Sequence, residues 1–231
     1  MVSTDTSPRA YVSQLRQQQA AATRERVVLA AAELFAERGY AGTTLPEIGR
    51  RAGVSTETVQ SHGPKVELLR AAIDAVSFGA GPGAAVADTE LGRLLADAAD
   101  PAEAARRSAE VLATVNERSH GVWMAFSEAS RNDEGLTQQL RRLTEEIAAQ
   151  TEVVLEQWRA RGWLRTDRPI AELVRRAGAI GSVELWDRLV RVEGRSPRAY
   201  RELIAGLLLD ALLANPAGVD DFATAAESQG S

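Results

Sequence analysis

Residues 24–69 read RERVVLAAAELFAERGYAGTTLPEIGRRAGVSTETVQSHGPKVELL, and this stretch decides the fold of the N-terminal part of the chain. Its first section repeats apolar residues at the spacing of one helix face. Gly39 then supplies the left-handed conformation that commonly ends a helix. The sequence therefore predicts a helix from about Thr23 to this glycine. Its apolar face consists of Val27, Ala31, Leu34 and Phe35.

Two shorter helices are predicted next, on either side of a tight turn. The first opens with Thr44-Leu45-Pro46-Glu47, a capping box in which the threonine and the glutamate each satisfy a backbone N–H of the other. Gly53 allows a sharp turn, and Ser55 is a favourable N-cap for a helix that runs to about Ser61. Two short helices around such a turn are typical of a helix-turn-helix, which places its second helix in the major groove of DNA.

The charge of the chain is unevenly distributed. The formal net charge of −5 is unusual for a DNA-binding protein. However, residues 1–80 hold nine basic and eight acidic side chains, whereas the remainder holds 18 basic and 24 acidic ones. The acidic excess therefore lies outside the predicted helix-turn-helix. A balance of +1 is still small, and it favours a protein that neutralises DNA phosphates with two copies.

The later segments show helical periodicity and no convincing alternation, so we expect an all-α protein. The segment 79–84 formally fits a G-x-G-x-x-A pattern, but no strand precedes it, and we reject a dinucleotide site. The expected organisation is a flexible polar arm at 1–22, a DNA-binding domain at 23–79, a linker at 80–87, a helical domain at 88–214 and a tail at 215–231. Within the helical domain we expect helices at 88–97, 101–118, 120–131, 134–161, 169–193 and 197–214. The alternative for the arm, which contains Arg9 and Arg16, is a basic segment that touches DNA.

The third helix carries the side chains best suited to read DNA. If Val54 and Val59 pack inward, its exposed face presents a glutamine, Gln60, that can pair with adenine N6 and N7. The start of the second helix offers backbone N–H groups that favour a phosphate. Thr44 and Ser55 would cap helices in any protein, so a structural role alone is the alternative for them. The predicted DNA contacts are Thr43, Thr44, Ser55, Thr56, Glu57, Gln60, Ser61, His62 and Lys65.

These residues together resemble the TetR family of bacterial transcriptional repressors. The resemblance runs through the segment from Ala31 to Tyr40, Thr43-Thr44, Ile48, Ala52-Gly53-Val54-Ser55, Thr58-Val59, Lys65 and Leu68-Leu69. It implies a homodimer, a palindromic DNA operator, and a larger helical domain, here 88–214, that binds an effector and dimerises. The family usually has a tyrosine where this chain has Gln60, and a phenylalanine where it has Gly63. The phosphate contact of that tyrosine is lost, and Gln60 is expected to read a base instead.

The resemblance also implies which helices meet across the dimer. The last two long helices of each subunit would form a four-helix bundle, with Gly178 and Gly181 allowing close approach. The alternative is that these apolar stripes pack only within one subunit. The predicted dimer contacts are Leu173, Ala177, Ile180, Leu185, Leu189, Ile204, Leu207, Leu208 and Ala211.

An effector pocket is expected among the middle helices, where large apolar side chains supply the usual lining of a small-molecule site. The alternative is that these side chains are ordinary core. The candidate lining residues are Asn116, His120, Trp123, Met124, Phe126 and Trp158.

Other classes of protein are disfavoured. The chain has no cysteine and two histidines, so no metal and no cofactor are expected. The N-terminus lacks the apolar core of a signal peptide, and the apolar runs are too short to cross a bilayer, which predicts a soluble cytoplasmic protein with no membrane partner. No catalytic motif is present, and an enzyme is not expected. The leading interpretation is a homodimeric repressor that a small apolar effector releases from double-stranded operator DNA. The alternative is a TetR-like protein that has lost specific DNA binding and acts through protein partners.

Overall fold

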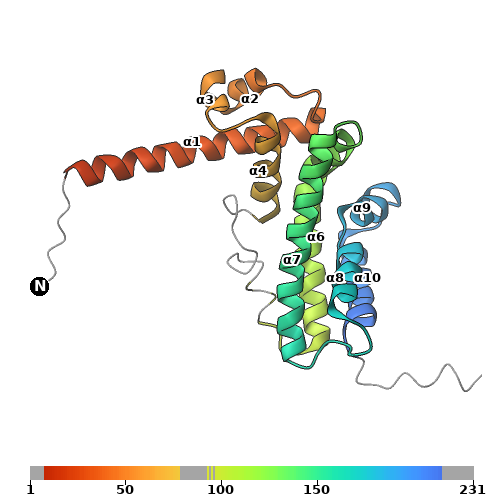
Figure 1. The fold of residues 1–231 in the computed structure, drawn as a ribbon. Helices are drawn as coiled ribbons and strands as arrows, with labels where there is room; N and C mark the ends of the chain where they lie inside the picture. Colours follow the sequence, from red (N-terminus) through yellow and green to blue (C-terminus); the bar gives the residue numbers. More distant parts are fainter. Residues whose placement is uncertain (1–7, 79–92, 94, 96, 215–231) are drawn as a thin grey trace, which may run out of the picture. The chain divides into compact units, whose positions relative to one another are not determined.

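The computed structural model describes residues 8–78, 93, 95 and 97–214, and the helices are labelled in Figure 1. In the described residues the elements are helical, apart from an isolated antiparallel bridge between Leu164 and Leu213. The expectation of an all-α fold is confirmed. The helices are α1 (Pro8–Arg38), α2 (Leu45–Ala52), α3 (Thr56–Gln60), α4 (Lys65–Phe78), α6 (Pro101–Ser130), α7 (Glu134–Ala160), α8 (Ile170–Ile180), α9 (Val183–Trp186), the π-helical turn η2 (Asp187–Val192) and α10 (Pro197–Leu212).

The chain forms two compact units. The first contains residues 1–84 and 118–140, and the second contains residues 85–117 and 141–231. The long helices α6 and α7 therefore contribute to both units. The predicted division into domains assigned 118–140 to the C-terminal domain, whereas the contacts of the chain group this segment with the N-terminal helices.

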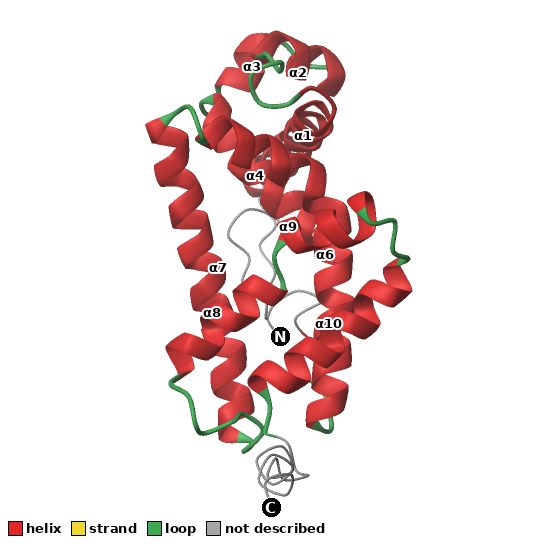
Figure 2. Cartoon of the chain, turned by 90° about the vertical axis from the view of Figure 1, so that its right-hand side faces the viewer, coloured by secondary structure: helices red, strands yellow, loops and turns green. Residues whose placement is uncertain are grey.

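The first unit is organised around α1, against which α2 and α4 pack (Figures 1 and 2). The predicted apolar face of α1 is buried as expected, with Val27, Ala31 and Phe35 fully inaccessible and Leu34 nearly so. Later in the chain, α6 approaches α1 closely at Gly121, where an added Cβ would lie 2.6 Å from the Cβ of Ala36. This contact needs a residue without a side chain.

The start of α1 differs from the expectation. The sequence predicted a helix from about Thr23 preceded by a polar arm at 1–22, but α1 begins at Pro8. Residues 8–22 contain no glycine and only the initial proline, which is tolerated in a first helical turn, so nothing in their sequence interrupts the helix. Residues 16–22 are all exposed. The absence of an apolar stripe made this helix hard to recognise.

The second unit has its own apolar core. Trp158, Leu173, Tyr200 and Ile204 lie at most 4% exposed within it, and the ring of Tyr200 meets Trp186 edge to face at 4.7 Å. The core is drawn from α6, α7, α8 and α10 together with the α9–η2 segment. No helix among the residues placed here combines the length and the apolar character needed to span a bilayer.

Two of the predicted helix boundaries are wrong. The helices expected at 101–118 and 120–131 are one continuous helix, α6. The single helix expected at 169–193 is instead divided into α8, α9 and η2, because α8 ends at Gly181 and the hydroxyl of Ser182 accepts a hydrogen bond from the N–H of Leu185 to start α9. The predicted linker 80–87, most of the helix predicted at 88–97 and the tail 215–231 lie outside the described residues.

Candidate nucleic-acid interface

The second helix begins with the predicted capping box. The hydroxyl of Thr44 accepts from the N–H of Glu47, and the N–H of Thr44 donates to the Glu47 carboxylate at 3.0 Å. The hydroxyl of Thr44 also donates to the Glu47 carboxylate. The hydrogen bonds from this hydroxyl and from the backbone N–H of Thr44 lower the pKa of Glu47, and the hydroxyl is the larger cause. The start of α2 is therefore fixed by its own first turn.

The turn and the third helix also follow the local sequence. Gly53 adopts the left-handed conformation that the turn requires, at φ 69°. Ser55 caps α3 through the N–H of Thr58 at 3.2 Å. Gly49 allows the turn to pack closely on α2, since an added Cβ there would lie 3.0 Å from the carbonyl oxygen of Val54. Gly49 was not among the predicted residues, although glycine inside a helix is a signal of close packing.

Ion pairs join α2 to α1. The guanidinium of Arg51 contacts Glu33 at 2.7 Å and Glu37 at 3.1 Å, and Arg38 at the end of α1 contacts Glu47 at 2.7 Å. The hydrogen bond from Arg51 lowers the pKa of Glu37. Such exposed pairs contribute little energy individually, but they occupy the guanidinium groups of Arg51 on α2 and Arg38 on α1. Glu33 and Glu37 stand four residues apart on α1, a spacing that could have indicated this contact.

Lys65 turns toward the protein. Its Nζ donates to the carbonyl oxygen of Thr43 at 2.7 Å and lies 4.1 Å from the centroid of the Tyr40 ring. Burial lowers the pKa of this lysine. Lys65 therefore ties the first residue of α4 to the loop before α2. The sequence predicted a phosphate contact for this side chain and did not predict this tie.

The exposed face of α3 carries most of the predicted base-reading residues. Glu57 and Gln60 are exposed and Thr56 is half-buried, while Val59 is fully buried and anchors the helix. Ser61 is exposed and its hydroxyl donates to the carbonyl oxygen of Thr58. The structure thus brings these side chains together on one short helix that rests on a fixed turn.

Two of the predicted phosphate contacts need correction. Thr43 is fully inaccessible, and its hydroxyl donates to the carbonyl oxygens of Leu34 and Gly39, so it cannot reach a ligand. Thr44 is exposed, but its N–H and its hydroxyl both donate to the Glu47 carboxylate, which occupies the position predicted for a phosphate. His62 is half-buried, and its Nε2 has no hydrogen-bond partner among the described residues.

The geometry agrees with a comparison to protein families. Residues 27–72 match the model described as "Bacterial regulatory proteins, tetR family". These residues form a DNA-binding domain of the TetR type. The matched residues run from the buried face of α1 into α4 and include the whole helix-turn-helix. A TetR protein is a transcriptional regulator with a DNA-binding fold, and the expectation drawn from the resemblance is confirmed at that level.

Solved TetR structures resemble most of the chain. A protein described as a TetR-family transcriptional regulator from Rhodococcus sp. is 20% identical, with 83% of this chain and 99% of that chain covered and a TM-score of 0.68. SmeT in complex with triclosan is 25% identical, with 86% and 95% covered and a TM-score of 0.64. NalD, the secondary repressor of the MexAB-OprM multidrug efflux pump in Pseudomonas aeruginosa, is 18% identical, with 84% and 97% covered and a TM-score of 0.59. No curated protein matches the chain.

The residues predicted to line a TetR effector pocket divide between the two units. Asn116 and Trp158 belong to the second unit, and His120, Trp123, Met124 and Phe126 to the first. Asn116 is 2% exposed, and its amide donates to the carbonyl oxygen of Gly181 and to the hydroxyl of Tyr200, both at 3.1 Å. This amide therefore holds the break between α8 and α9. Its expected role as a ligand contact is replaced by a structural one, because those donors are already used.

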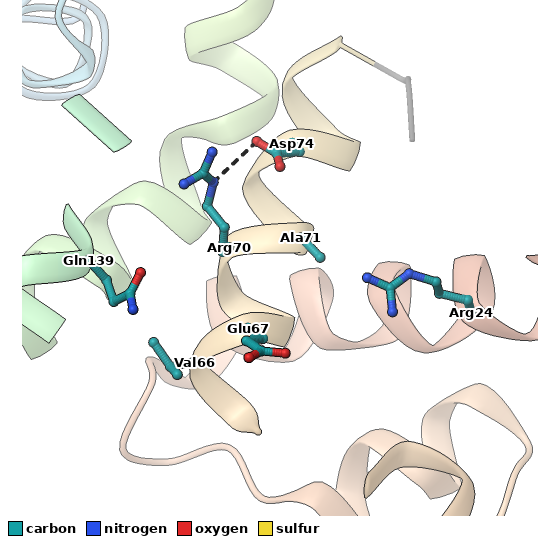
Figure 3. Close-up of a pocket in the computed structure, with 7 residues that line it drawn as sticks. All are labelled: Arg24, Val66, Glu67, Arg70, Ala71, Asp74 and Gln139. Atoms are coloured by element: carbon teal, nitrogen blue, oxygen red, sulfur yellow. Dashed lines mark ion pairs between the residues drawn. The ribbon is translucent and has the colours of Figure 1, made fainter. Parts of the chain in front are cut away.

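A cavity of about 180 Å³ lies elsewhere in the first unit (Figure 3). Its lining comes from α1, α4 and the first turns of α7, and includes the ion pair between Arg70 and Asp74, whose atoms are 3.6 Å apart. None of the predicted effector residues lines it. The lining residues are Arg24, Val66, Glu67, Arg70, Ala71, Asp74 and Gln139.

The residues predicted for the TetR dimer contact fall into two groups. Those that are at most 7% exposed in the core of their own subunit have almost no surface left for a partner and were wrongly assigned; these are Leu173, Leu189, Ile204 and Leu208. The others retain exposed surface: Leu207 is 38% exposed, and Ala177, Ile180, Leu185 and Ala211 are half-buried. The apolar stripe is buried, as expected, but much of it is buried by other residues of the same chain and not by a second subunit.

Proposed function

We propose that this protein is a homodimeric transcriptional repressor that reads a palindromic operator through α3 and is released from it by a small-molecule effector. The observation that carries the proposal is the exposed polar face of α3, held by the Ser55 cap and the buried Val59. A side chain on a rigid helix can be placed accurately against a base edge. Gln60 is the residue we assign to base reading, through a paired contact to adenine N6 and N7.

A dimer is supported by the outer surface of α8 and α10. Leu203, Leu207 and Leu209 are 37%, 38% and 37% exposed, so three large apolar side chains lie at the surface of one helix, α10. Added Cβ atoms at Gly178 and Gly206 would meet open space, so these exposed glycines leave room for a second helix to approach. We propose that two copies of this surface meet across a two-fold axis. Two α3 helices would then enter half-sites about one helical turn apart.

Release by an effector is supported by what the similar structures contain. SmeT, which is 25% identical, was solved with triclosan, and NalD is a repressor of an efflux pump. A ligand can release DNA only by binding more tightly to the conformation that does not fit the operator, with a coupling of about 1–3 kcal/mol typical of such proteins. The large apolar residues Trp123 and Met124 on α6 are half-buried and remain our candidates for the contact.

The second candidate function is a TetR-like protein that acts through protein partners. The paired state of Arg38 and Arg51 favours it, because these cations are already neutralised within the domain. The same observation can be explained if the positive charge for DNA comes from another part of the chain.

The test is selection of binding sites from a random-sequence duplex library with the full-length protein. A symmetric sequence is expected to be enriched, and sedimentation is expected to show a dimer. Gln60→Ala is expected to weaken binding to the selected duplex by about 1–3 kcal/mol and to relax one position in each half-site. Gln150→Ala, which truncates an exposed glutamine on α7, is the matched control and is expected to change nothing.

The outcomes separate the two functions. If the selection enriches no symmetric sequence, the operator-binding dimer is contradicted. Sedimentation as a monomer at micromolar concentration would contradict it as well. An equal loss on every sequence with Gln60→Ala contradicts base reading by this residue.

A further inference from the structure

The helix-turn-helix of this chain has little charge to offer DNA. Residues 27–78, which include α2, α3 and α4, hold five basic and six acidic side chains. Attraction to the phosphate backbone supplies essentially all of the sequence-independent affinity of DNA-binding proteins. A segment with a net charge of −1 cannot supply that attraction by itself.

The basic side chains of this segment are also largely occupied. Arg51 is held by Glu33 and Glu37, and Arg38 by Glu47, at distances between 2.7 and 3.1 Å. The ammonium of Lys65 points to the carbonyl oxygen of Thr43 and the ring of Tyr40. Arg70 contacts Asp74 on α4. Among the lysine and arginine side chains described in the segment, Arg50 is the one for which neither an ion pair nor a hydrogen bond is found, and it is exposed on α2.

The preceding part of α1 has the opposite character. Residues 8–26, which we call the α1 extension, hold four arginines and one glutamate. They are helical from Pro8, and no acidic residue lies in the first turn. Arg16 and Arg26 are exposed, as is every residue from 16 to 22. In Figure 1 this part of α1 continues past α2, α3 and α4.

The exposed part of α1, residues 16–22, has no packing partner of its own. Isolated helices shorter than about 12–15 residues are marginal in water, and most helical stability in proteins comes from packing of an apolar face. The exposed residues 16–22 are arginine, glutamine and alanine, so they offer no large apolar side chain to a partner. The charge of the extension therefore indicates a polyanionic partner rather than an apolar groove.

We propose that the α1 extension is a second DNA contact, which binds backbone phosphates outside the major-groove half-site read by α3. This inference rests on the proposed function, because it assumes that the protein binds DNA. At about 1.5 Å per residue the extension reaches about 28 Å beyond Val27, the length of about eight base pairs. It contributes the positive charge that the helix-turn-helix lacks, and it reads no base.

A second copy of the chain is the competing partner, since residues 81–231 have an acidic excess. DNA is favoured because the extension is continuous with the helix on which the helix-turn-helix is built. If the extension bound acidic residues of a partner subunit instead, its positive charge would not be available to DNA. Residues 27–78, with their net charge of −1, would then have to attract the phosphates alone.

The experiment needs no knowledge of the operator, because a phosphate contact is independent of sequence. The affinity of the full-length protein for a labelled mixed-sequence duplex of about 40 base pairs is measured by anisotropy between about 50 and 200 mM salt. The double variant Arg16→Gln/Arg26→Gln removes two charges from each extension. In a dimer the slope of log affinity against log salt is expected to fall by about 3 to 4, with the affinity at the lowest salt reduced at least tenfold.

The control is Arg159→Gln, which removes one exposed charge from the end of α7 in the second unit. This substitution also breaks the surface ion pair between Arg159 and Glu156. It is expected to leave the slope unchanged. Neither substitution touches a buried side chain, so circular dichroism and sedimentation are expected to match the unaltered protein.

The outcomes distinguish this inference from the proposed function. A slope that is the same in the double variant and in the unaltered protein overturns the inference while leaving DNA binding intact. A changed sedimentation coefficient of the double variant with an unchanged slope also overturns it, and assigns the extension to the dimer. If the unaltered protein binds no duplex at any salt concentration, including its selected sequences, the proposed function fails and the inference fails with it.

Discussion

The helix-turn-helix and the break between α8 and α9 both start a short helix with a serine or threonine cap, yet different contacts hold them. Around the helix-turn-helix, the decisive contacts join residues three apart, such as Thr44 with Glu47 and Ser55 with Thr58. At the break, the amide of Asn116 reaches the carbonyl oxygen of Gly181, 65 residues later in the chain. The first arrangement is specified locally, whereas the second depends on a distant residue of α6.

The largest effect is expected at the distant contact. Asn116→Ala leaves the carbonyl oxygen of Gly181 and the hydroxyl of Tyr200 buried without this donor, and unsatisfied buried polar groups cost about 1–3 kcal/mol each. We expect the free energy of unfolding of the second unit to fall by about 3 kcal/mol. Tryptophan fluorescence in urea measures it, because Trp186 packs against Tyr200. Tyr200→Phe, which removes only the hydroxyl, is the graded control and should cost about 1 kcal/mol. A smaller loss for Asn116→Ala than for Tyr200→Phe would contradict the assignment.

An intermediate effect is expected at the local cap. Ser55→Ala removes the acceptor for the N–H of Thr58 and should destabilise the first unit by about 1 kcal/mol, the usual cost of a lost N-cap. Amide hydrogen exchange of α3 residues measures it. Thr151→Ala is the control, since the hydroxyl of Thr151 only donates to the preceding turn in the middle of α7. Equal effects of the two substitutions would show that the cap does not hold α3.

The smallest effect is a dependence on pH. The pKa of Glu47 is lower in the folded protein, so its capping contacts stabilise the fold above the ordinary glutamate pKa near 4.5. This contribution is lost as the pH falls through the lowered folded pKa. The difference in Tm between the unaltered protein and Glu47→Gln should therefore be present at pH 7 and shrink in acid. Glu152→Gln, at an exposed position of α7, should show no such difference at either pH. A difference that grows in acid would reverse the sign and reject this role.

The same contrast explains what could be predicted from the sequence. Capping box, glycine turn and serine cap are recognisable because each acts within one helical turn, and all three are confirmed. The break at Gly181 could have been suspected from its glycine, but the periodicity of 169–193 continues across it. The contact that fixes the break comes from Asn116, and no spacing in the sequence indicates such a partner.

Close packing and charge pairing could not be predicted from the sequence either. Gly121 looks like an ordinary helix interruption until Ala36 is placed beside it. Thr43 and Lys65 were assigned to DNA because of their position near the turn, whereas burial and the contacts with Leu34, Gly39 and Tyr40 decide their role. The predicted dimer residues on α8 and α10 were read from one apolar stripe, and a stripe alone does not indicate which chain covers it.

Because α1 is one continuous helix, a movement of its buried part also moves its exposed part. The part of α1 buried against α2 and α4 and the exposed part with Arg16 belong to one rigid helix. Arg16 stands about 16 Å along the axis from Val27, so a rotation of the domain by about 10° carries it sideways by about 3 Å. That distance is about the length of a hydrogen bond to a phosphate oxygen. A reorientation of the domain is thereby magnified along α1, and a phosphate contact of Arg16 would be lost as the rotation grows.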